Sequence, residues 1–211
     1  TASGNTALAM GRQSTASGNF SIAQGNVAQA TNTGAIALGD SAFASGNSSI
    51  AIGSSAVGTN ALYVATTQAL ASGDFAIALG QSAKATAIRT IAQGFSATAQ
   101  GNDSIAIGTG AVASGNRSIS IGYGNTVSGN NSGAFGDPSI ILGANSFSVG
   151  NNNSIGATQT GVFALGNNIT VTANNSVGLG SNAAMTTALT TSSGGTTAVS
   201  SGTVGTITYG S

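Results

Sequence analysis

A short repeat with a period of 14 constrains the fold of this chain more than any other feature of its sequence. A glycine closes a short apolar run at Gly11, Gly25, Gly39, Gly53, Gly80, Gly94, Gly108, Gly122, Gly136, Gly150, Gly166 and Gly180. The numbers of neighbouring glycines in this series differ by 14, except for a step of 27 before Gly80 and a step of 16 before Gly166. We interpret the step of 27 as two units, the second one residue short, with Thr67 in the glycine place. The step of 16 indicates an insertion. Repetition at a fixed period is typical of proteins that stack one structural unit on the next.

Each unit has the pattern of two short strands and two turns. One example is Ser104-Ile105-Ala106-Ile107-Gly108, which is followed by Ala111-Val112-Ala113. A Gly-Asn or Gly-Asp pair such as Gly115-Asn116 closes many units, and we expect these pairs to supply the positive φ of a tight turn. Frequent glycine and β-branched isoleucine disfavour a helix. The sequence therefore predicts an all-β fold, a β-solenoid of parallel strands with 12 or 13 coils and a length of about 60 Å.

Both faces of the first strand in each unit are apolar, which is the pattern of a strand buried on both sides. A coil made from so short a unit is thin, so one face is covered by the coil itself and only small residues such as alanine fit inside. The larger side chains would form a contiguous apolar patch if they were exposed, and we expect them to pack between subunits. The pattern leaves open which face points into the coil. The expected interface residues are Ile36, Leu38, Ile50, Ile52, Ile77, Leu79, Ile105, Ile107, Ile119 and Ile121.

The second strand of each unit carries alanine on one face and a variable residue at its centre. The variable residues are Thr15, Gln29, Phe43, Val57, Leu70, Lys84, Thr98, Val112 and Thr126. Variable chemistry at a fixed place indicates an outer wall. Exposed apolar and cationic groups on a polar wall can anchor a partner, so the candidate binding residues are Phe43, Val57, Lys84 and Val112. The alternative is that these four residues are tolerated variation without a role.

The composition excludes several classes of function. The chain has 4 Lys+Arg, 4 Asp+Glu, no His and no Cys, with a formal net charge of zero. It therefore has no cysteine nucleophile, no histidine base and no Cys/His metal site. It also has no electrostatic footprint for nucleic acid or an anionic membrane. We expect no catalytic residue, no cofactor and no metal.

The few charged residues fall at repeated positions of the units. Asp40, Asp74, Asp103 and Asp137 lie in different units, which favours roles in turns over a paired catalytic site. Arg89, Asp103 and Arg117 occupy one position in three successive units, which predicts an exposed ladder of ion pairs. A ligand-binding role for these three residues is the alternative.

The Ser-Ile-Ala-Ile-Gly strand followed by an Ala-x-Ala-x-Gly-Asn unit resembles the YadA-like head of trimeric autotransporter adhesins. The segments 131–138, 147–156 and 162–168 are also similar to its head repeats, and the resemblance covers about residues 2–180. It implies a left-handed parallel β-roll in each chain and a homotrimer of parallel chains, either intertwined or side by side. It also implies display on the surface of a Gram-negative bacterium through a C-terminal outer-membrane anchor outside this sequence.

The resemblance further implies a role in virulence, namely multivalent attachment to host extracellular matrix proteins or cell-surface receptors, together with autoaggregation. We expect residues 1–180 to be the head and residues 181–211, rich in Thr, Ser and Gly, to be a connector or the start of another module. A purely structural spacer in a surface fibre is one alternative. An ice-binding β-solenoid is another, although the Thr-x-Thr pairs at 170–172 and 206–208 are isolated.

Overall fold

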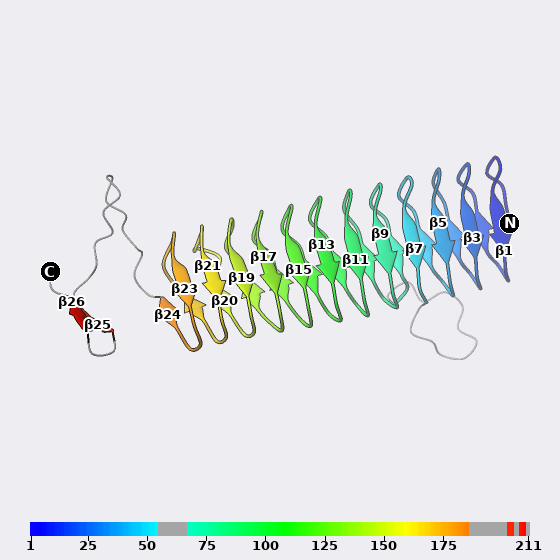
Figure 1. Ribbon diagram of the computed structural model, residues 1–211. Coiled ribbons are helices and arrows are strands. Elements are labelled where there is room, and N and C mark those ends of the chain that lie inside the picture. The colour runs from blue at the N-terminus through cyan, green and yellow to red at the C-terminus, as the bar shows by residue number, and fades with distance from the viewer. Residues whose placement is uncertain (55–66, 186–201, 205–206, 210–211) are drawn as a thin grey trace.

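The computed structural model describes residues 1–54, 67–185, 202–204 and 207–209 of the chain. Residues 1–54 and 67–185 form a row of coils, each built from two short strands and two turns (Figure 1). The coils follow one another in sequence order along the row, as the repeat predicts. The described part of the chain contains no helix that is long and apolar enough to cross a membrane.

The strands belong to two parallel sheets that run the length of the row. The first sheet holds the odd-numbered strands β1 (Leu8–Met10), β3 (Ile22–Gln24), β5 (Ile36–Leu38), β7 (Ile50–Ile52), β9 (Ile77–Leu79), β11 (Ile91–Gln93), β13 (Ile105–Ile107), β15 (Ile119–Ile121), β17 (Gly133–Phe135), β19 (Phe147–Val149), β21 (Phe163–Leu165) and β23 (Val177–Leu179). The second holds the even-numbered strands β2 (Thr15–Ala16), β4 (Gln29–Ala30), β6 (Phe43–Ala44), β8 (Leu70–Ala71), β10 (Lys84–Ala85), β12 (Thr98–Ala99), β14 (Val112–Ala113), β16 (Thr126–Val127), β18 (Ile140–Ile141), β20 (Ser154–Ile155), β22 (Thr170–Val171) and β24 (Ala184–Met185). Strands β25 (Gly202–Val204) and β26 (Ile207–Tyr209) form a separate antiparallel pair.

Each residue pairs with the residue at the same place in the next coil. In the pairing of β13 with β15, Ile105 lies beside Ile119 and Ile107 lies beside Ile121. Identical positions therefore form straight ladders along the row, so that a side-chain type repeated in every unit of the sequence becomes one stripe on the structure. The predicted all-β solenoid of parallel strands is confirmed, and the described residues contribute 12 strands to each of the two sheets.

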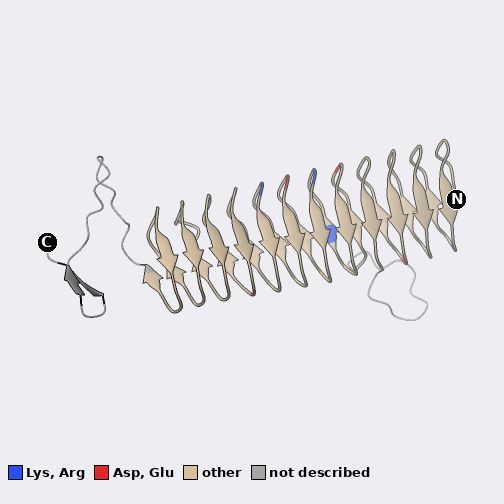
Figure 2. Ribbon diagram, viewed as in Figure 1, with Lys and Arg blue, Asp and Glu red and all other residues tan. Residues whose placement is uncertain are grey.

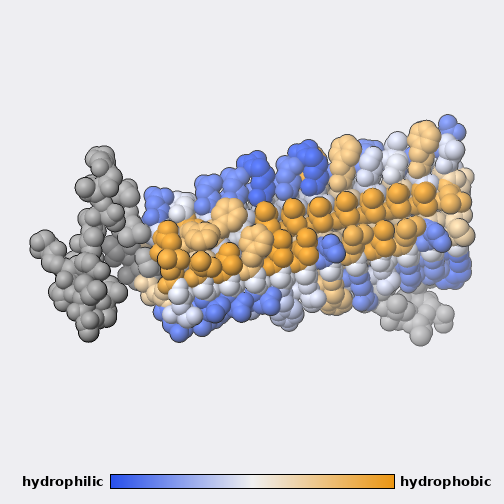
Figure 3. Space-filling view, in the orientation of Figure 1, coloured by the Kyte–Doolittle hydropathy of each residue, from blue (hydrophilic) through white to orange (hydrophobic). Residues whose placement is uncertain are grey.

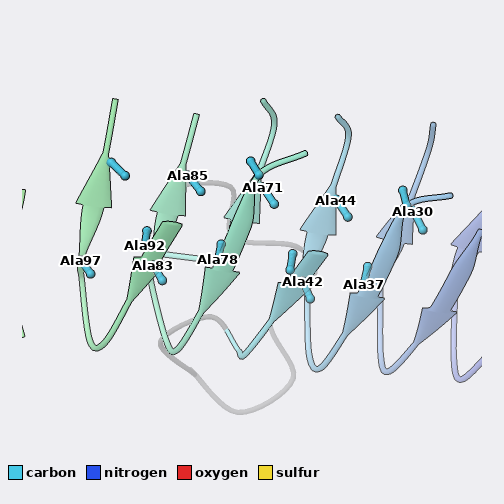
Figure 4. Close-up of a cluster of buried hydrophobic side chains, with 14 of the residues drawn as sticks. Ala30, Ala37, Ala42, Ala44, Ala71, Ala78, Ala83, Ala85, Ala92 and Ala97 are labelled. Atoms are coloured by element: carbon cyan, nitrogen blue, oxygen red, sulfur yellow. The ribbon is translucent and has the colours of Figure 1, made fainter. Parts of the chain in front are cut away.

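The space between the two sheets is filled by alanine over most of the row. Ala78 from β9 and Ala85 from β10 are fully buried there, as are the equivalent alanines of neighbouring coils (Figure 4). Because successive side chains alternate along a strand, the residues beside a buried alanine of the odd-numbered strands, such as Ile105 and Ile107 beside Ala106, point away from the interior. This arrangement settles which face points inward: the alanine face fills the coil and the isoleucine face lies outside it.

The interior changes character after β14. The buried alanine of the even-numbered strands is replaced by Val127, Ile141, Ile155 and Val171 in the following coils, and all four side chains are at most 1% exposed. The two outward ladders continue through this region without a break in register. The stack therefore accepts larger side chains inside its C-terminal coils than the alanine-filled coils contain.

We expect Ile141→Ala to lower the free energy of unfolding by about 2–4 kcal/mol, because it leaves a cavity that the stacked backbone cannot close. The control is Ile140→Ala on the same strand, since Ile140 is 50% exposed while Ile141 is fully buried. Its expected cost is below about 1 kcal/mol. Chemical denaturation followed by circular dichroism measures both, and equal costs would contradict the inward assignment of Ile141.

In the Gly-Asn turns, the positive φ does not lie on the residues where the sequence predicts it. Positive φ falls on the residue after the pair, for example on Arg117 with φ 55°, whereas Gly115 does not adopt it. Gly115 is required because a Cβ there would lie 2.2 Å from the carbonyl oxygen of Gly129 in the next coil. Asn116 uses its side-chain oxygen to accept a hydrogen bond of 3.0 Å from the backbone amide of Asn102. The pair thus makes room for the next coil and bonds to the preceding one.

The predicted coil between Gly53 and Gly80 is wrong. Strand β7 pairs directly with β9, and β6 pairs directly with β8, so no strand is inserted between them. A coil in the expected register would place Tyr63 at the interior position where Ser49 is fully buried. It would also place Thr67 where glycine adopts φ values of 101° to 147° in other coils. Neither residue suits its place.

The other irregular spacing is an insertion, as predicted. Strand β19 pairs with β21, and β20 pairs with β22, so the two extra residues fall in the turn between β20 and β21. At the C-terminal end of the row, β24 pairs with β22, which carries the second sheet to Met185. This sheet therefore extends beyond residue 180, where the sequence pattern fades.

Candidate interaction surfaces

The outward face of the odd-numbered strands carries two parallel rows of side chains, which we call the apolar stripe (Figure 3). The first row consists of Leu8, Ile22, Ile36, Ile50, Ile77, Ile91, Ile105, Ile119, Gly133, Phe147, Phe163 and Val177. The second consists of Met10, Gln24, Leu38, Ile52, Leu79, Gln93, Ile107, Ile121, Phe135, Val149, Leu165 and Leu179. All ten residues expected at a subunit interface belong to these rows.

The apolar stripe is accessible to solvent in the single chain. Apart from the buried Gly133, its residues are half-buried or exposed, and Met10 and Leu165 are exposed by 50% and 45%. A stripe two side chains wide and about 55 Å long covers on the order of 600 Å². That area reaches the upper end of the largest apolar patches on ordinary monomers and approaches the roughly 800 Å² that each partner contributes to a stable interface.

The residues of the apolar stripe change from β17 onward, where phenylalanine becomes common. Gly133 stands in the first row where earlier coils carry isoleucine, and the ring of Phe147 from the next coil occupies the space that a side chain at Gly133 would need. A Cβ on Gly133 would lie 2.8 Å from this ring. Aromatic side chains continue the stripe at Phe135 and Phe163. The apolar surface is therefore continuous across the glycine.

The even-numbered strands face outward with different chemistry. Their central ladder runs through Phe43, Leu70, Lys84, Thr98 and Val112, which confirms that this position varies from coil to coil. The residues two places further on are mostly hydroxyl-bearing, and they bond along the row, as Ser114 donates to the Ser128 hydroxyl at 2.9 Å. One sheet is therefore apolar in both rows apart from Gln24 and Gln93, whereas the other is mixed in one row and polar in the next.

Three of the four candidate binding residues lie on this mixed row. Phe43, Lys84 and Val112 are all half-buried, with Leu70 between Phe43 and Lys84, and Thr98 between Lys84 and Val112. They lie on one face but do not form a cluster. Val57 lies outside the described residues, and the ladder passes directly from Phe43 to Leu70.

Exposed aromatic residues at the turns are a further feature of the surface. Phe20 and Phe75 occupy a turn before odd-numbered strands, while Phe95 and Tyr123 occupy the turn after them, and each is more than half exposed. The signal for them in the sequence is a large aromatic residue at a turn place where other units carry small or polar residues. These four residues are not among the binding residues predicted from the sequence.

Charged side chains gather on the turns before β11, β13 and β15 (Figure 2). Arg89 donates two hydrogen bonds to the Asp103 carboxylate, at 2.5 and 3.0 Å. These bonds lower the pKa of Asp103 and raise the pKa of Arg89. Arg117 instead donates to the Asn131 side-chain oxygen at 2.6 Å. The predicted ladder thus forms one solvent-exposed ion pair among the described residues, followed by a neutral step.

The other aspartates accept hydrogen bonds from the preceding coil. Asp40 accepts from the Asn26 amide at 2.8 Å, and Asp74 accepts from the backbone amide of Asn47 at 2.8 Å. Asp137 accepts from the backbone amide of Tyr123. The described residues contain no group of three or more carboxylate, histidine or cysteine side chains that could hold a metal ion. These aspartates act as links between coils.

Comparison with known proteins agrees with this architecture. The family model described as the YadA head domain repeat, which spans two copies, matches residues 2–28, 30–56, 67–83, 71–92, 85–111 and 113–137. Together these segments cover more than half of the chain, and they leave out residues 57–66, within the gap between β7 and β8. A search of curated proteins finds no match.

Proposed function

This chain belongs to the YadA head family, and we propose that three copies of it assemble into the adhesive head of a trimeric autotransporter adhesin. The family is one of non-enzymatic, surface-exposed adhesins. In the proposed assembly each chain is a left-handed roll, and the three chains lie parallel with their apolar stripes facing one another. The head would be held at the outer membrane of a Gram-negative bacterium by parts of the protein outside this sequence.

The apolar stripe is the observation that carries the proposal. Two rows of isoleucine, leucine and phenylalanine run along one sheet and are accessible in the single chain, while the other sheet carries a row of hydroxyl-bearing side chains. Association of three stripes removes this apolar area from water, and each square ångström buried contributes roughly 25 cal/mol. The occupant that fits a stripe repeated at the pitch of the coils is a second copy with the same pitch.

The mixed row of the even-numbered strands would then face outward on all three chains. Binding through Phe43, Lys84 or Val112 would present three copies of each contact on one rigid head, so weak contacts would gain from high effective concentration. Host extracellular matrix proteins or cell-surface receptors are the proposed partners, and contacts between heads on neighbouring cells would give autoaggregation.

The two alternative functions, an ice-binding solenoid and a spacer, require different properties of the outward face of the even-numbered strands. An ice-binding surface needs a flat and chemically regular array, whereas the observed ladder passes through Phe43, Leu70, Lys84 and Thr98 in consecutive coils. A spacer needs no ligand-binding face, and it would show trimer assembly without adherence. The exposed aromatic residues at the turns favour a binding surface over a spacer.

Two measurements on the purified chain test the proposal. Sedimentation equilibrium should give a mass of three chains, and a monodisperse monomer would rule out the assembly. Adherence of the trimer to immobilised collagen, fibronectin and laminin should then be compared with adherence of a Lys84→Ala variant and of a Thr98→Ala variant as control. A trimer that adheres to none of these proteins, and that does not aggregate cells displaying it, would have the role of a spacer.

A further inference from the structure

Two glutamines interrupt the second row of the apolar stripe. Gln24 lies between Met10 and Leu38, and Gln93 lies between Leu79 and Ile107. Both side chains are exposed, and two blue interruptions of the orange band are visible in Figure 3. The first row has isoleucine at the corresponding places, Ile22 and Ile91. Glutamine therefore takes the place of an apolar residue in only one row and in only two coils, and these coils lie four coils apart.

A stripe built from one repeating unit has a problem of register. Between β1 and β15 the first row carries only leucine and isoleucine, at a constant spacing of about 4.8 Å. Three such stripes could slide along one another by one coil and still place aliphatic side chains against aliphatic side chains. Between β1 and β15, apolar contact alone therefore does not distinguish the aligned trimer from trimers with one chain shifted.

We infer that Gln24 and Gln93 line the axis of the proposed trimer and fix its axial register. The inference depends on the trimer proposed above. A glutamine amide carries both donors and acceptors, so three copies related by a threefold axis can bond to one another in one layer. Opposite an isoleucine or leucine of a neighbouring chain, the same amide would be buried without a partner, which is unfavourable. We therefore place the second row, which contains the glutamines, at the threefold axis, where it contacts the second rows of the other two chains.

The positions of Gln24 and Gln93 along the row allow only one alignment of the three chains. A shift by one, two or three coils pairs neither glutamine of the shifted chain with a glutamine of its neighbours. A shift by four coils brings Gln24 of one chain level with Gln93 of another but leaves the remaining two glutamines unmatched. Only zero shift pairs all of them, as a single buried polar residue fixes register in a coiled coil.

The chain supplies its own probe of register. It has two methionines, and Met10 lies directly beside Gln24 in the second row. In a trimer with exact threefold symmetry the three Met10 methyl groups are equivalent and give one resonance. A trimer with one chain shifted places them in three different surroundings. Methyl NMR of the chain labelled with carbon-13 at methionine therefore reports alignment.

The first test replaces both glutamines in the full chain, Gln24→Leu with Gln93→Leu. Sedimentation should still show three chains, while the Met10 methyl signal should split from one resonance into several as shifted trimers appear. The matched control is Gln29→Leu, because Gln29 lies on β4, the strand of the even-numbered sheet that directly follows β3, in the ladder where Leu70 occurs naturally. It should leave one Met10 resonance.

The second test moves one of the two glutamines by one coil and keeps their number. The variant carries Gln93→Leu and Ile107→Gln, so that its glutamines lie five coils apart and no shift pairs both of them with those of a wild-type chain. It should form trimers with itself, but mixed trimers with differently tagged wild-type chains should fall by about tenfold relative to mixing of two wild-type chains. Circular dichroism of each variant shows that the β-structure is retained.

The outcomes separate this inference from the proposal on which it rests. A wild-type chain that sediments as a monomer overturns the trimer and the register mechanism together. A wild-type trimer whose double leucine variant keeps one Met10 resonance overturns the register mechanism alone, and so does free mixing of the moved-glutamine variant with wild type. Splitting of the resonance in the Gln29→Leu control as well would also overturn it, since the effect would then not depend on the stripe.

Discussion

Replacing Ile107 with Asp is expected to convert the trimer into monomers. Ile107 lies in the second row of the apolar stripe, between Gln93 and Ile121, and its side chain points away from the alanine-filled interior. Assembly would bury three carboxylates at one level of the axis with no basic residue in either row. Burial of an unpaired charge costs at least about 3 kcal/mol for each chain, and the three charges also repel one another. The isolated coil should tolerate the change because the side chain is not part of its interior.

The matched control is Thr98→Asp, which places the same side chain at the centre of an even-numbered strand. Thr98 is half-buried between Lys84 and Val112 on the mixed row, where a carboxylate stays hydrated and Lys84 is its neighbour in register. Sedimentation should give one chain for Ile107→Asp and three for Thr98→Asp, with β-structure retained in both. If both variants dissociate, or if neither does, the assignment of the two faces is wrong.

A substantial part of the fold could be predicted because one local rule is repeated. The period of the repeat determines which residues stack, and alternation along the strand places Ala106 and Ile107 on opposite faces. The identity of the inward face required one further fact, the thickness of the coil. The structure supplies it, since fully buried alanines fill the interior from β2 to β14.

The errors in the prediction have a common physical origin. Periodicity assigns a place to every residue but does not test whether the side chain fits that place. Thr67 keeps the spacing of 14, but the coil that it implies requires Tyr63 at a buried place where other coils carry alanine, serine, threonine or valine. The candidate Val57 was derived from the same coil, and it lies outside the described residues. Volume at the buried positions was the signal that could have exposed the error.

The role of the glycine in the Gly-Asn turns could not be predicted from the repeat pattern either. Composition indicated that Gly-Asn pairs belong to turns, but the reason for the glycine lies in the next coil, which a single unit cannot reveal. The Asn116 side chain bonds to the preceding coil, and Gly115 leaves space for the following one. Contacts between coils, which are long-range in sequence, therefore decide residue choices that look local.

Gly108→Ala is expected to be among the most destabilising single substitutions in the stack, because two independent restrictions meet at this residue. Its φ is 124°, a value that L-residues rarely adopt. A Cβ would also lie 2.1 Å from the carbonyl oxygen of Gly122 in the next coil. The backbone on both sides is held by ladder hydrogen bonds, so neither coil can move away without loss of pairing. We expect a loss of about 3 kcal/mol or more in the free energy of unfolding.

Gly110→Ala tests whether the effect belongs to this position or to glycine in general. Gly110 lies two residues further along the same turn with φ 66°, and the nearest atom to an added Cβ is the Gly124 Cα at 4.0 Å. Ser41, Ser82 and Ser96 occupy the equivalent place in other coils with φ between 55° and 59°. A side chain is therefore compatible with this place, and the expected cost is about 1 kcal/mol. Chemical denaturation at equal protein concentration compares the two variants. Equal losses would mean that the spacing between coils does not impose the glycine of the repeat, and a larger loss for Gly108→Ala would assign it to the φ value and the approach of the next coil, which act together at Gly108.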